Sequence, residues 1–296
     1  MQPIGRAALV PEFTAYAALG DRAAGLTGAR GVLGSLLKER LERHGITTVD
    51  YPGDVNNAEA LSQWFSTHQF GAFFHFAALV PVTAVERDPL LAYQTNVIGT
   101  FNVCRALLHT QKDCWLFHSS SSHVYQPTSG NSPIIEDAPR VPPTFYGVTK
   151  LAAELVVESL MGKLQAPYCI GRVFSFTHAR QAPPYLVPNL ALRIAALGDG
   201  DVLEVDDPSA VRDIQDAEQV IDAVLHLAHA RAQGAVNIGT GTGRSVREIA
   251  AAVAKAMGRS IRITGVDRGR PSVLIADTTR LRALLPAASS DGIARA

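Results

Sequence analysis

Three glycines spaced three residues apart, with a helix-like segment directly after them, constrain the fold of this chain most strongly. Residues 26–37 read LTGARGVLGSLL, and apolar positions recur at helical spacing over residues 35–44. Small residues in such a turn allow the backbone to approach a pyrophosphate, and the following helix offers free N–H groups and a positive dipole end. The pattern predicts a dinucleotide-binding turn formed by Gly28, Arg30, Gly31, Val32, Leu33 and Gly34.

An acidic residue follows the turn at the distance expected for a ligand of the adenosine ribose. Asp50 ends the β-like run at residues 46–49, and its carboxylate can accept hydrogen bonds from both ribose hydroxyls, which favours NAD over NADP. Arg30 argues the other way, because a guanidinium in the turn can bind a 2′-phosphate, although it can equally be a solvated loop charge. The predicted cofactor is therefore NAD, with NADP left open.

Strand-like and helix-like segments alternate along the first half of the chain. This alternation predicts an α/β fold with a doubly wound parallel sheet. The β-like runs are residues 46–49, 72–76 and 115–117, and the helix-like stretches are residues 58–67, 90–108 and 146–161. The run that should precede the glycine turn, residues 23–26, has only weak β propensity.

The last third of the chain has a different character. It contains a proline-rich segment (182–188), a glycine-rich turn (239–243) and two helix-like runs (216–230 and 245–257). We expect three regions from this organisation: an N-terminal arm (1–22), a cofactor-binding domain (23–172, with return segments near 212–240) and a mainly substrate-binding lobe (173–296).

The charge and the cysteine content argue against several classes of protein. Lys plus Arg and Asp plus Glu each number 27, so no global basic field indicates nucleic acid and no polybasic run indicates a membrane surface. No apolar run reaches the roughly 18 residues of a membrane span, and no secretory signal is recognisable. The cysteines Cys104, Cys114 and Cys169 lack metal-ligand spacing. We expect a cytoplasmic protein with reduced thiols and no metal, nucleic-acid or membrane partner.

Tyr146 and Lys150 are the leading candidates for catalysis. They lie four residues apart in the stretch FYGVTK on a predicted helix, so they share a face. A free tyrosine has a pKa near 10, and bringing it to about 7 requires about 4 kcal/mol of preferential stabilisation of the phenolate. A neighbouring ammonium and a positive nicotinamide ring can supply it, which suits proton transfer at a sugar hydroxyl. The alternative is an ordinary pair on a helix surface.

A run of hydroxyls, FHSSSSHVY at residues 117–125, follows a β-like run. Buried hydroxyls are costly unless they form hydrogen bonds, and a ligand is the natural partner at the carboxyl end of a parallel strand. Otherwise the run is a polar turn without chemical meaning. His75 and His118, which also fall near strand ends, are expected to be structural.

Taken in order, these motifs make the chain resemble an extended short-chain dehydrogenase/reductase, of the NAD-dependent epimerase/dehydratase family that acts on nucleotide sugars. The resemblance extends from about Leu26 to Leu285. It depends on TGARGVLG, GDVNN, HFAA, NVIGT, SSSSHVY, Glu136-Asp137, Tyr146-x-x-x-Lys150, Arg172, Arg212-Asp213 and VNIGTGTGRSVREIA. It implies a Rossmann-type fold with a small C-terminal substrate-binding lobe.

The resemblance also implies roles for residues that match the family's motifs. The cofactor ligands would include Asp54 and Val55 at the adenine, Ala77 and Ala78 along the ribose and phosphates, and Asn96 at the sheet end. Ser121 would hydrogen-bond the reacting oxygen, and Lys150 would also hold the nicotinamide ribose. The substrate ligands would be Arg212, at the diphosphate of the nucleotide, with Ser122, His123 and Ser175.

Two departures from the family pattern bear on the reaction. Dehydratases and decarboxylases of the family place carboxylates after the serine, where this chain has Ser122 and His123, and this argues against both reactions. His123 is then either an extra acid or base, or a hydrogen-bonding residue of the pocket. The segment 175–179, which reads SFTHA, also differs from the usual substrate loop.

The predicted function is hydride transfer at C4 of a nucleotide-activated hexose, by a 4-epimerase or a 4-ketoreductase. The alternatives are a dehydratase or decarboxylase, and a non-catalytic, cofactor-sensing protein of the same fold. The intact set of Ser121, Tyr146 and Lys150 argues against the non-catalytic alternative. We expect a homodimer formed through the helices at 90–108 and 146–161. The sequence leaves the sugar and the nucleotide base open.

Overall fold

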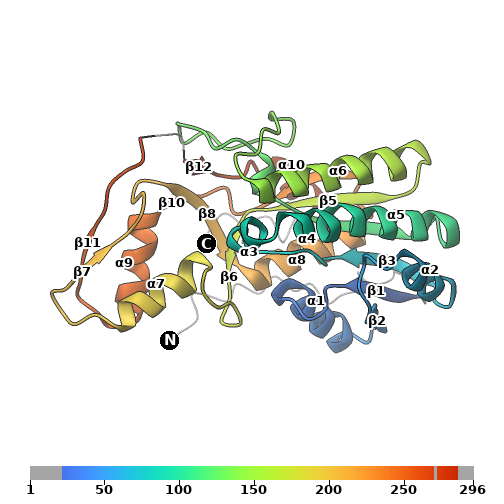
Figure 1. Cartoon of the computed structure of the whole chain (residues 1–296), viewed down its shortest axis with the longest axis horizontal. Coiled ribbons are helices and arrows are strands. Elements are labelled where there is room, and N and C mark those ends of the chain that lie inside the picture. The colour runs from blue at the N-terminus through green and yellow to red at the C-terminus, as the bar shows by residue number, and fades with distance from the viewer. Residues whose placement is uncertain (1–21, 270–271, 286–296) are drawn as a thin grey trace.

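The computed structural model describes residues 22–269 and 272–285. The predicted N-terminal arm, residues 1–22, lies outside these residues except for Arg22. Within the described part, six strands form a parallel sheet with the order β2-β1-β3-β4-β5-β9. They are β1 (Ala23–Thr27), β2 (Thr48–Asp50), β3 (Phe70–His75), β4 (Trp115–Ser121), β5 (Tyr168–Val173) and β9 (Gly234–Ile238). The predicted α/β fold with a doubly wound parallel sheet is confirmed (Figure 1).

Helices cover both faces of the sheet, because successive side chains of its strands bury themselves on opposite sides. On β3, for example, Phe74 belongs to one hydrophobic core and Phe73 to the other. The first core lies under α1 (Val32–Arg43) and α8 (Ala217–His229), and the second under α2 (Ala58–Ser66), α5 (Gly99–Thr110) and α6 (Phe145–Lys163).

The first strand forms despite its weak β propensity because it is paired on both sides. β1 is hydrogen-bonded to β2 and to β3, and Gly25 lies opposite Phe73. A Cβ atom at Gly25 would lie 2.5 Å from the Phe73 ring, so the glycine allows this ring to pack over the strand. Tertiary contacts here override local propensity.

The helix predicted at residues 90–108 is interrupted by a π-helical turn. The segments are α4 (Pro89–Tyr93), the π turn η2 (Gln94–Ile98) and α5, preceded by α3 (Val82–Arg87). The turn carries Asn96, whose Nδ2 donates to Thr149 Oγ1 of α6 at 3.0 Å and whose Oδ1 accepts from Leu79 N at 2.7 Å. Asn96 thereby ties the loop after β3 to α6, as expected of π turns near functional sites.

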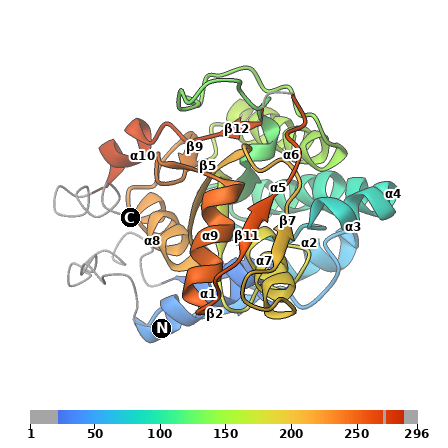
Figure 2. The ribbon, with the colours of Figure 1, turned by 90° about the vertical axis from the view of Figure 1, so that its left-hand side faces the viewer.

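The last third of the chain forms a smaller lobe beyond the carboxyl end of β5 (Figures 1 and 2). In it, β8 (Val211–Asp216) pairs with β6 (Ser175–Thr177), β10 (Gly243–Ser245) and β12 (Val273–Leu274), and β7 (Val202–Glu204) pairs with β11 (Arg262–Thr264). The helices α7 (Leu186–Ala195) and α9 (Val246–Ala256) share one core. Helix α7 was not expected from the sequence, because it begins inside the proline-rich segment 182–188. The chain returns to the sheet through α8 and β9, with α10 (Thr279–Leu284) beside β9.

Candidate active site

The carboxyl end of β4 meets the start of α6 through a tight backbone contact. After Ser121 the chain makes one 3-10 turn, η3 (Ser122–Val124), and Thr144 caps α6 by accepting a hydrogen bond from Gly147 N at 3.2 Å. A Cβ atom at Gly147 would lie 2.2 Å from the backbone oxygen of His123, so glycine is required here. The contact places the first turn of α6 against the end of the serine-rich run.

Tyr146 lies beside Ser121 in this corner. Burial raises the pKa of Tyr146 to about 12, although a hydrogen bond with Ser121 acts in the opposite direction, and the nearby Tyr185 adds to the rise. Ser121 is itself buried, and its Oγ accepts a hydrogen bond from His123 N at 3.2 Å. The protein alone therefore stabilises the neutral phenol, and forming the phenolate requires positive charge close to the hydroxyl.

Lys150 lies one helical turn after Tyr146 and is buried. Its Nζ donates a hydrogen bond to the backbone oxygen of Ser119 at 2.8 Å. Burial lowers the pKa of Lys150 to about 8, while the charge of Glu154, one further turn along α6, raises it. Lys150 thus remains mostly protonated at neutral pH and presents its charge on the helix face that carries Tyr146.

His123 packs against Tyr146, and Arg212 is near enough to His123 to affect its ionisation. The ring centroids of His123 and Tyr146 are 5.3 Å apart, in an edge-to-face arrangement at 68°. Burial and the positive charge of Arg212 lower the pKa of His123 to about 4, so this ring is neutral at pH 7.

Arg212, on β8, is anchored by Ser272, whose backbone oxygen accepts from the guanidinium at 2.6 Å. Burial lowers the pKa of Arg212, and Asp207 acts in the opposite direction. Among the described residues Arg212 has no ion-pair partner within 4.0 Å, so the guanidinium is suited to an anionic ligand.

Tyr185 belongs to this site although sequence reasoning did not select it. It lies directly before α7, near enough to Tyr146 to influence the ionisation of the phenol, and burial raises its own pKa. The only signal in the sequence is an aromatic residue after Pro183-Pro184. Ser122 and Ser175, the other predicted substrate ligands, lie on η3 and β6, and Ser122 is buried.

The glycine-rich turn forms a cradle against the loop after β3. Gly28 has a φ of +73°, and a Cβ atom there would lie 2.6 Å from the backbone nitrogen of Ala77. A Cβ atom at Gly34 would lie 2.3 Å from the oxygen of Gly28, so α1 could not pack as closely on the turn. Gly31 precedes α1 without a side-chain cap, and Ala77 and Ala78 are partly exposed next to the turn. Uncapped N–H groups at a helix start fit a phosphate.

Asp50 ends β2, as predicted. Its Oδ2 accepts a hydrogen bond from Lys38 Nζ at 2.5 Å, whereas its Oδ1 is buried without a hydrogen-bond partner in the described structure. The two predicted adenine ligands differ from each other: Asp54 is exposed, and Val55 is buried against Gly99 of α5.

The strand-end histidines lie behind the site. His75 is hydrogen-bonded to Thr27 Oγ1 at 2.7 Å and to Thr100 Oγ1 at 3.0 Å, which fits a structural role. His118 is buried near Lys150, and neither ring nitrogen has a hydrogen-bond partner in the described part of the chain. Burial lowers the pKa of His75 to about 3 and that of His118 well below its usual value.

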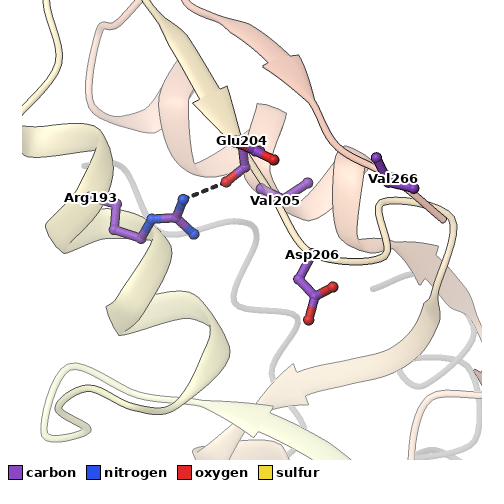
Figure 3. A pocket seen from close by; sticks show the side chains of 5 residues that line it. All are labelled: Arg193, Glu204, Val205, Asp206 and Val266. Carbon is purple, nitrogen blue, oxygen red and sulfur yellow. Dashed lines mark hydrogen bonds between the residues drawn. The ribbon is translucent and has the colours of Figure 1, made fainter. Parts of the chain in front are cut away.

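A pocket of about 290 Å³ lies on the lobe. Figure 3 shows its lining, in which Arg193 of α7 donates a hydrogen bond to the backbone oxygen of Glu204, and Asp206 and Val266 lie opposite. Over residues 22–269 and 272–285, no cluster of His, Cys, Asp or Glu could hold a metal ion, and no helix is long and apolar enough to cross a membrane.

Comparisons with known proteins agree with this geometry. Residues 38–276 match the family model described as GDP-mannose 4,6 dehydratase. UDP-glucose 4-epimerase of Lactobacillus helveticus is 30% identical over 256 residues, which cover 79% of this chain and 77% of that protein. UDP-glucose 4-epimerase of Thermus thermophilus, in complex with NAD, superposes with a TM-score of 0.78 at 22% identity, covering 88% of this chain and 92% of that one. MoeE5, in complex with UDP-glucuronic acid and NAD, superposes with a TM-score of 0.75 at 25% identity, covering 89% of this chain and 92% of that one.

The fold, the family model and the sequence relatives define an extended short-chain dehydrogenase/reductase. Within that class, the chain belongs to the NAD-dependent epimerase/dehydratase family, which the model for GDP-mannose 4,6 dehydratase represents. The family predicted from the sequence motifs is confirmed, and with it the prediction of an enzyme.

Proposed function

We propose that this protein is an NAD-dependent 4-epimerase of a nucleotide-activated hexose. One observation carries the proposal: Ser121, Tyr146 and Lys150 meet at the carboxyl end of β4, with no carboxylate at positions 122 and 123. The likeness to the Lactobacillus helveticus protein, named UDP-glucose 4-epimerase, supports the same reaction.

NAD would lie across the glycine turn, with its pyrophosphate on the uncapped start of α1. The buried Oδ1 of Asp50 lacks a hydrogen-bond partner in the described structure, so it could accept a hydrogen bond from a ribose hydroxyl. The other proposed ligands are Gly28, Arg30, Gly31, Val32, Leu33, Gly34, Asp54, Val55, Ala77, Ala78 and Asn96, with Tyr146 and Lys150 at the nicotinamide end. When bound, the cofactor supplies and accepts the hydride.

Tyr146 would carry the proton of the C4 hydroxyl, and Ser121 would hydrogen-bond the same oxygen. The pKa of Tyr146 must fall from about 12 to about 7, and this difference of about 5 units corresponds to roughly 7 kcal/mol at 1.4 kcal/mol per unit. Lys150 contributes because a protonated ammonium on the same helix face favours the phenolate. The hydrogen bond from Ser121 acts in the same direction.

The substrate would enter from the lobe. Arg212 is placed to bind the diphosphate, and Ser122, His123, Ser175 and Tyr185 would surround the hexose. The lobe pocket lies on the segment 204–206, which leads into β8 and Arg212, so we expect the nucleoside on that side.

The proposal is tested by weighing products. The purified protein is incubated with UDP-, dTDP- and GDP-hexoses and with their 4-keto-6-deoxy derivatives, and the products are analysed by mass and by the configuration at C4. An unchanged mass with inversion at C4 supports epimerisation. Loss of one water or of carbon dioxide contradicts the proposal. Tyr146→Phe is the control and should give no product.

A 4-ketoreductase is the second candidate function. It is favoured by the short stretch between Asp50 and Asp54, which resembles that of sugar-nucleotide reductases. The same assay separates the two, because reduction adds two hydrogens to a 4-keto substrate and consumes NADH or NADPH.

We further propose that the protein is a homodimer in the cytoplasm. Large apolar side chains are exposed along α4, η2, α5 and α6: Leu90, Leu91, Tyr93, Ile98, Phe101, Phe145, Val148 and Leu155. An isologous contact would cover them with the same face of a second copy. The cysteines of the described chain are free and buried, as expected in a reducing compartment.

A further inference from the structure

Lys38 is tied to the residue that would recognise the adenosine ribose. It lies on α1, and its Nζ donates a hydrogen bond to Asp50 Oδ2 at 2.5 Å, with the two side chains 35% and 28% exposed. That hydrogen bond is the main reason why the pKa of Lys38 is raised. Glu42, one turn further along α1, is 3.9 Å from the same ammonium. The positive charge is therefore held at the end of β2.

The two oxygens of the Asp50 carboxylate have different surroundings. Oδ2 is engaged by Lys38, and Oδ1 is buried and without a partner among the described residues. One acceptor is thus free for a ribose hydroxyl, while the other is fixed by an ion pair. A fixed carboxylate loses less conformational freedom when it binds the ribose than a mobile one does.

The Lys38–Asp50 pair also determines how the site interacts with the 2′-phosphate of NADP. The phosphate is repelled by the Asp50 carboxylate, and Lys38 cannot compensate while Asp50 neutralises it. Once Asp50 loses its charge, Glu42 at 3.9 Å is the remaining carboxylate near the Lys38 ammonium, which is then available at the end of β2 for charge-assisted hydrogen bonds to a phosphate.

We propose that Lys38 controls the choice between NAD and NADP: paired with Asp50 it positions the carboxylate for the ribose diol, and released from Asp50 it binds the 2′-phosphate. This inference rests on the proposed binding of NAD at Asp50. Lys38 acts on NAD through Asp50 and is a positioning residue there.

The test measures dissociation constants for NAD and NADP by tryptophan fluorescence, after bound nucleotide has been removed. The proteins are the wild type, Lys38→Met, Asp50→Asn, the double variant, and Arg43→Met as a control that removes a positive charge from an exposed position of α1. We expect Lys38→Met to weaken NAD binding about threefold to tenfold, the effect of a partly exposed ion pair or hydrogen bond. Arg43→Met should stay within about twofold.

The decisive comparison concerns NADP. Asp50→Asn should tighten NADP binding about tenfold or more, and the double variant should lose most of that gain, because it lacks the ammonium that would form a charge-assisted hydrogen bond to the phosphate. A double variant that keeps the gain would show that another cation, such as Arg30, binds the phosphate. Unchanged NAD binding in Lys38→Met would refute the positioning role alone. A folded wild type that binds neither dinucleotide would refute the proposed function as well.

Discussion

Replacing Glu154 by glutamine removes a charge from the buried support of the active site without changing the shape of the side chain. Glu154 is fully buried, one turn of α6 beyond Lys150. Its carboxylate accepts hydrogen bonds from Ser120 Oγ at 2.5 Å, from Arg172 at 2.8 Å and from Arg140 at 3.0 Å. Arg172 donates to both oxygens of this carboxylate, so in either orientation the amide nitrogen of a glutamine would face a guanidinium donor in place of an acceptor.

The expected loss of stability depends on the charge of Arg172, which Glu154→Gln leaves without a counter-ion. Arg172 is 3% exposed, and its other contacts are neutral oxygens: the Tyr125 hydroxyl and the Glu136 backbone oxygen, both at 2.7 Å. Its buried charge would lack a counter-ion, and removing one partner of a buried pair costs about 3–5 kcal/mol. That is a large share of the roughly 5–15 kcal/mol that stabilises a typical protein.

The matched control is Glu158→Gln, which removes a carboxylate from the same helix. Glu158 is 32% exposed and pairs with Arg140, so its loss should cost about 1 kcal/mol or less. Both variants are unfolded in urea with the fluorescence of the buried Trp115 as the signal. A loss for Glu154→Gln of less than about 1 kcal/mol, or one equal to that of the control, would refute the assigned role of this network.

Three further predictions follow from the site and its surroundings. Tyr146→Phe should lower kcat at least about 100-fold and leave the Kd for NAD within a few-fold, measured by product formation and by titration, and retention of most activity would remove Tyr146 from the mechanism. Because burial keeps the folded-state pKa of His118 well below 6.5, the stability that depends on its neutral form is lost as pH falls below 6.5. Between pH 7.5 and 5, the free energy of unfolding measured in urea should therefore fall by about 2 kcal/mol less in His118→Phe than in the wild type. An equal fall in both proteins would contradict the burial of this ring. Leu155→Glu should give a monomer by light scattering, whereas Leu192→Glu, at a position on α7 that is also exposed, should not; a dimer in both variants would place the interface elsewhere.

The sheet and the Tyr146 corner were predictable because their signals are local. The glycine turn, the serine-rich run and the Tyr-x-x-x-Lys spacing each lie within about ten residues, and the alternation of strands and helices fixes their order along a parallel sheet. What remained uncertain, the strand before the turn, depends on pairing with β2 and β3 on both sides. The β propensity of residues 23–26 carries no information about those neighbouring strands.

The lobe was harder to predict because its strands are short and pair with distant segments. β8 is hydrogen-bonded to β6, β10 and β12, and β12 contains only Val273 and Leu274, too few residues to show a period of two. Tyr185, which is near enough to Tyr146 to raise its pKa, has no motif of its own. The serine-rich run was recognised as polar, but its residues differ in role: Ser121 joins Tyr146, whereas Ser120 supports Glu154.

The position of His123 bears on which reaction this site can perform. Burial is the larger cause of its low pKa and Arg212 the smaller. A diphosphate bound at Arg212 would offset the second cause only, so burial would still favour the neutral imidazole near pH 7. A neutral imidazole can orient a sugar hydroxyl by hydrogen bonding, but it is a far weaker acid than imidazolium and so a poor proton donor to a departing hydroxyl. Elimination of water needs such a donor in addition to a base, whereas hydride transfer at C4 needs one proton carrier, the role that we propose for Tyr146. The electrostatics of His123 and the absence of a carboxylate at Ser122 therefore favour the same reaction, epimerisation or reduction at C4.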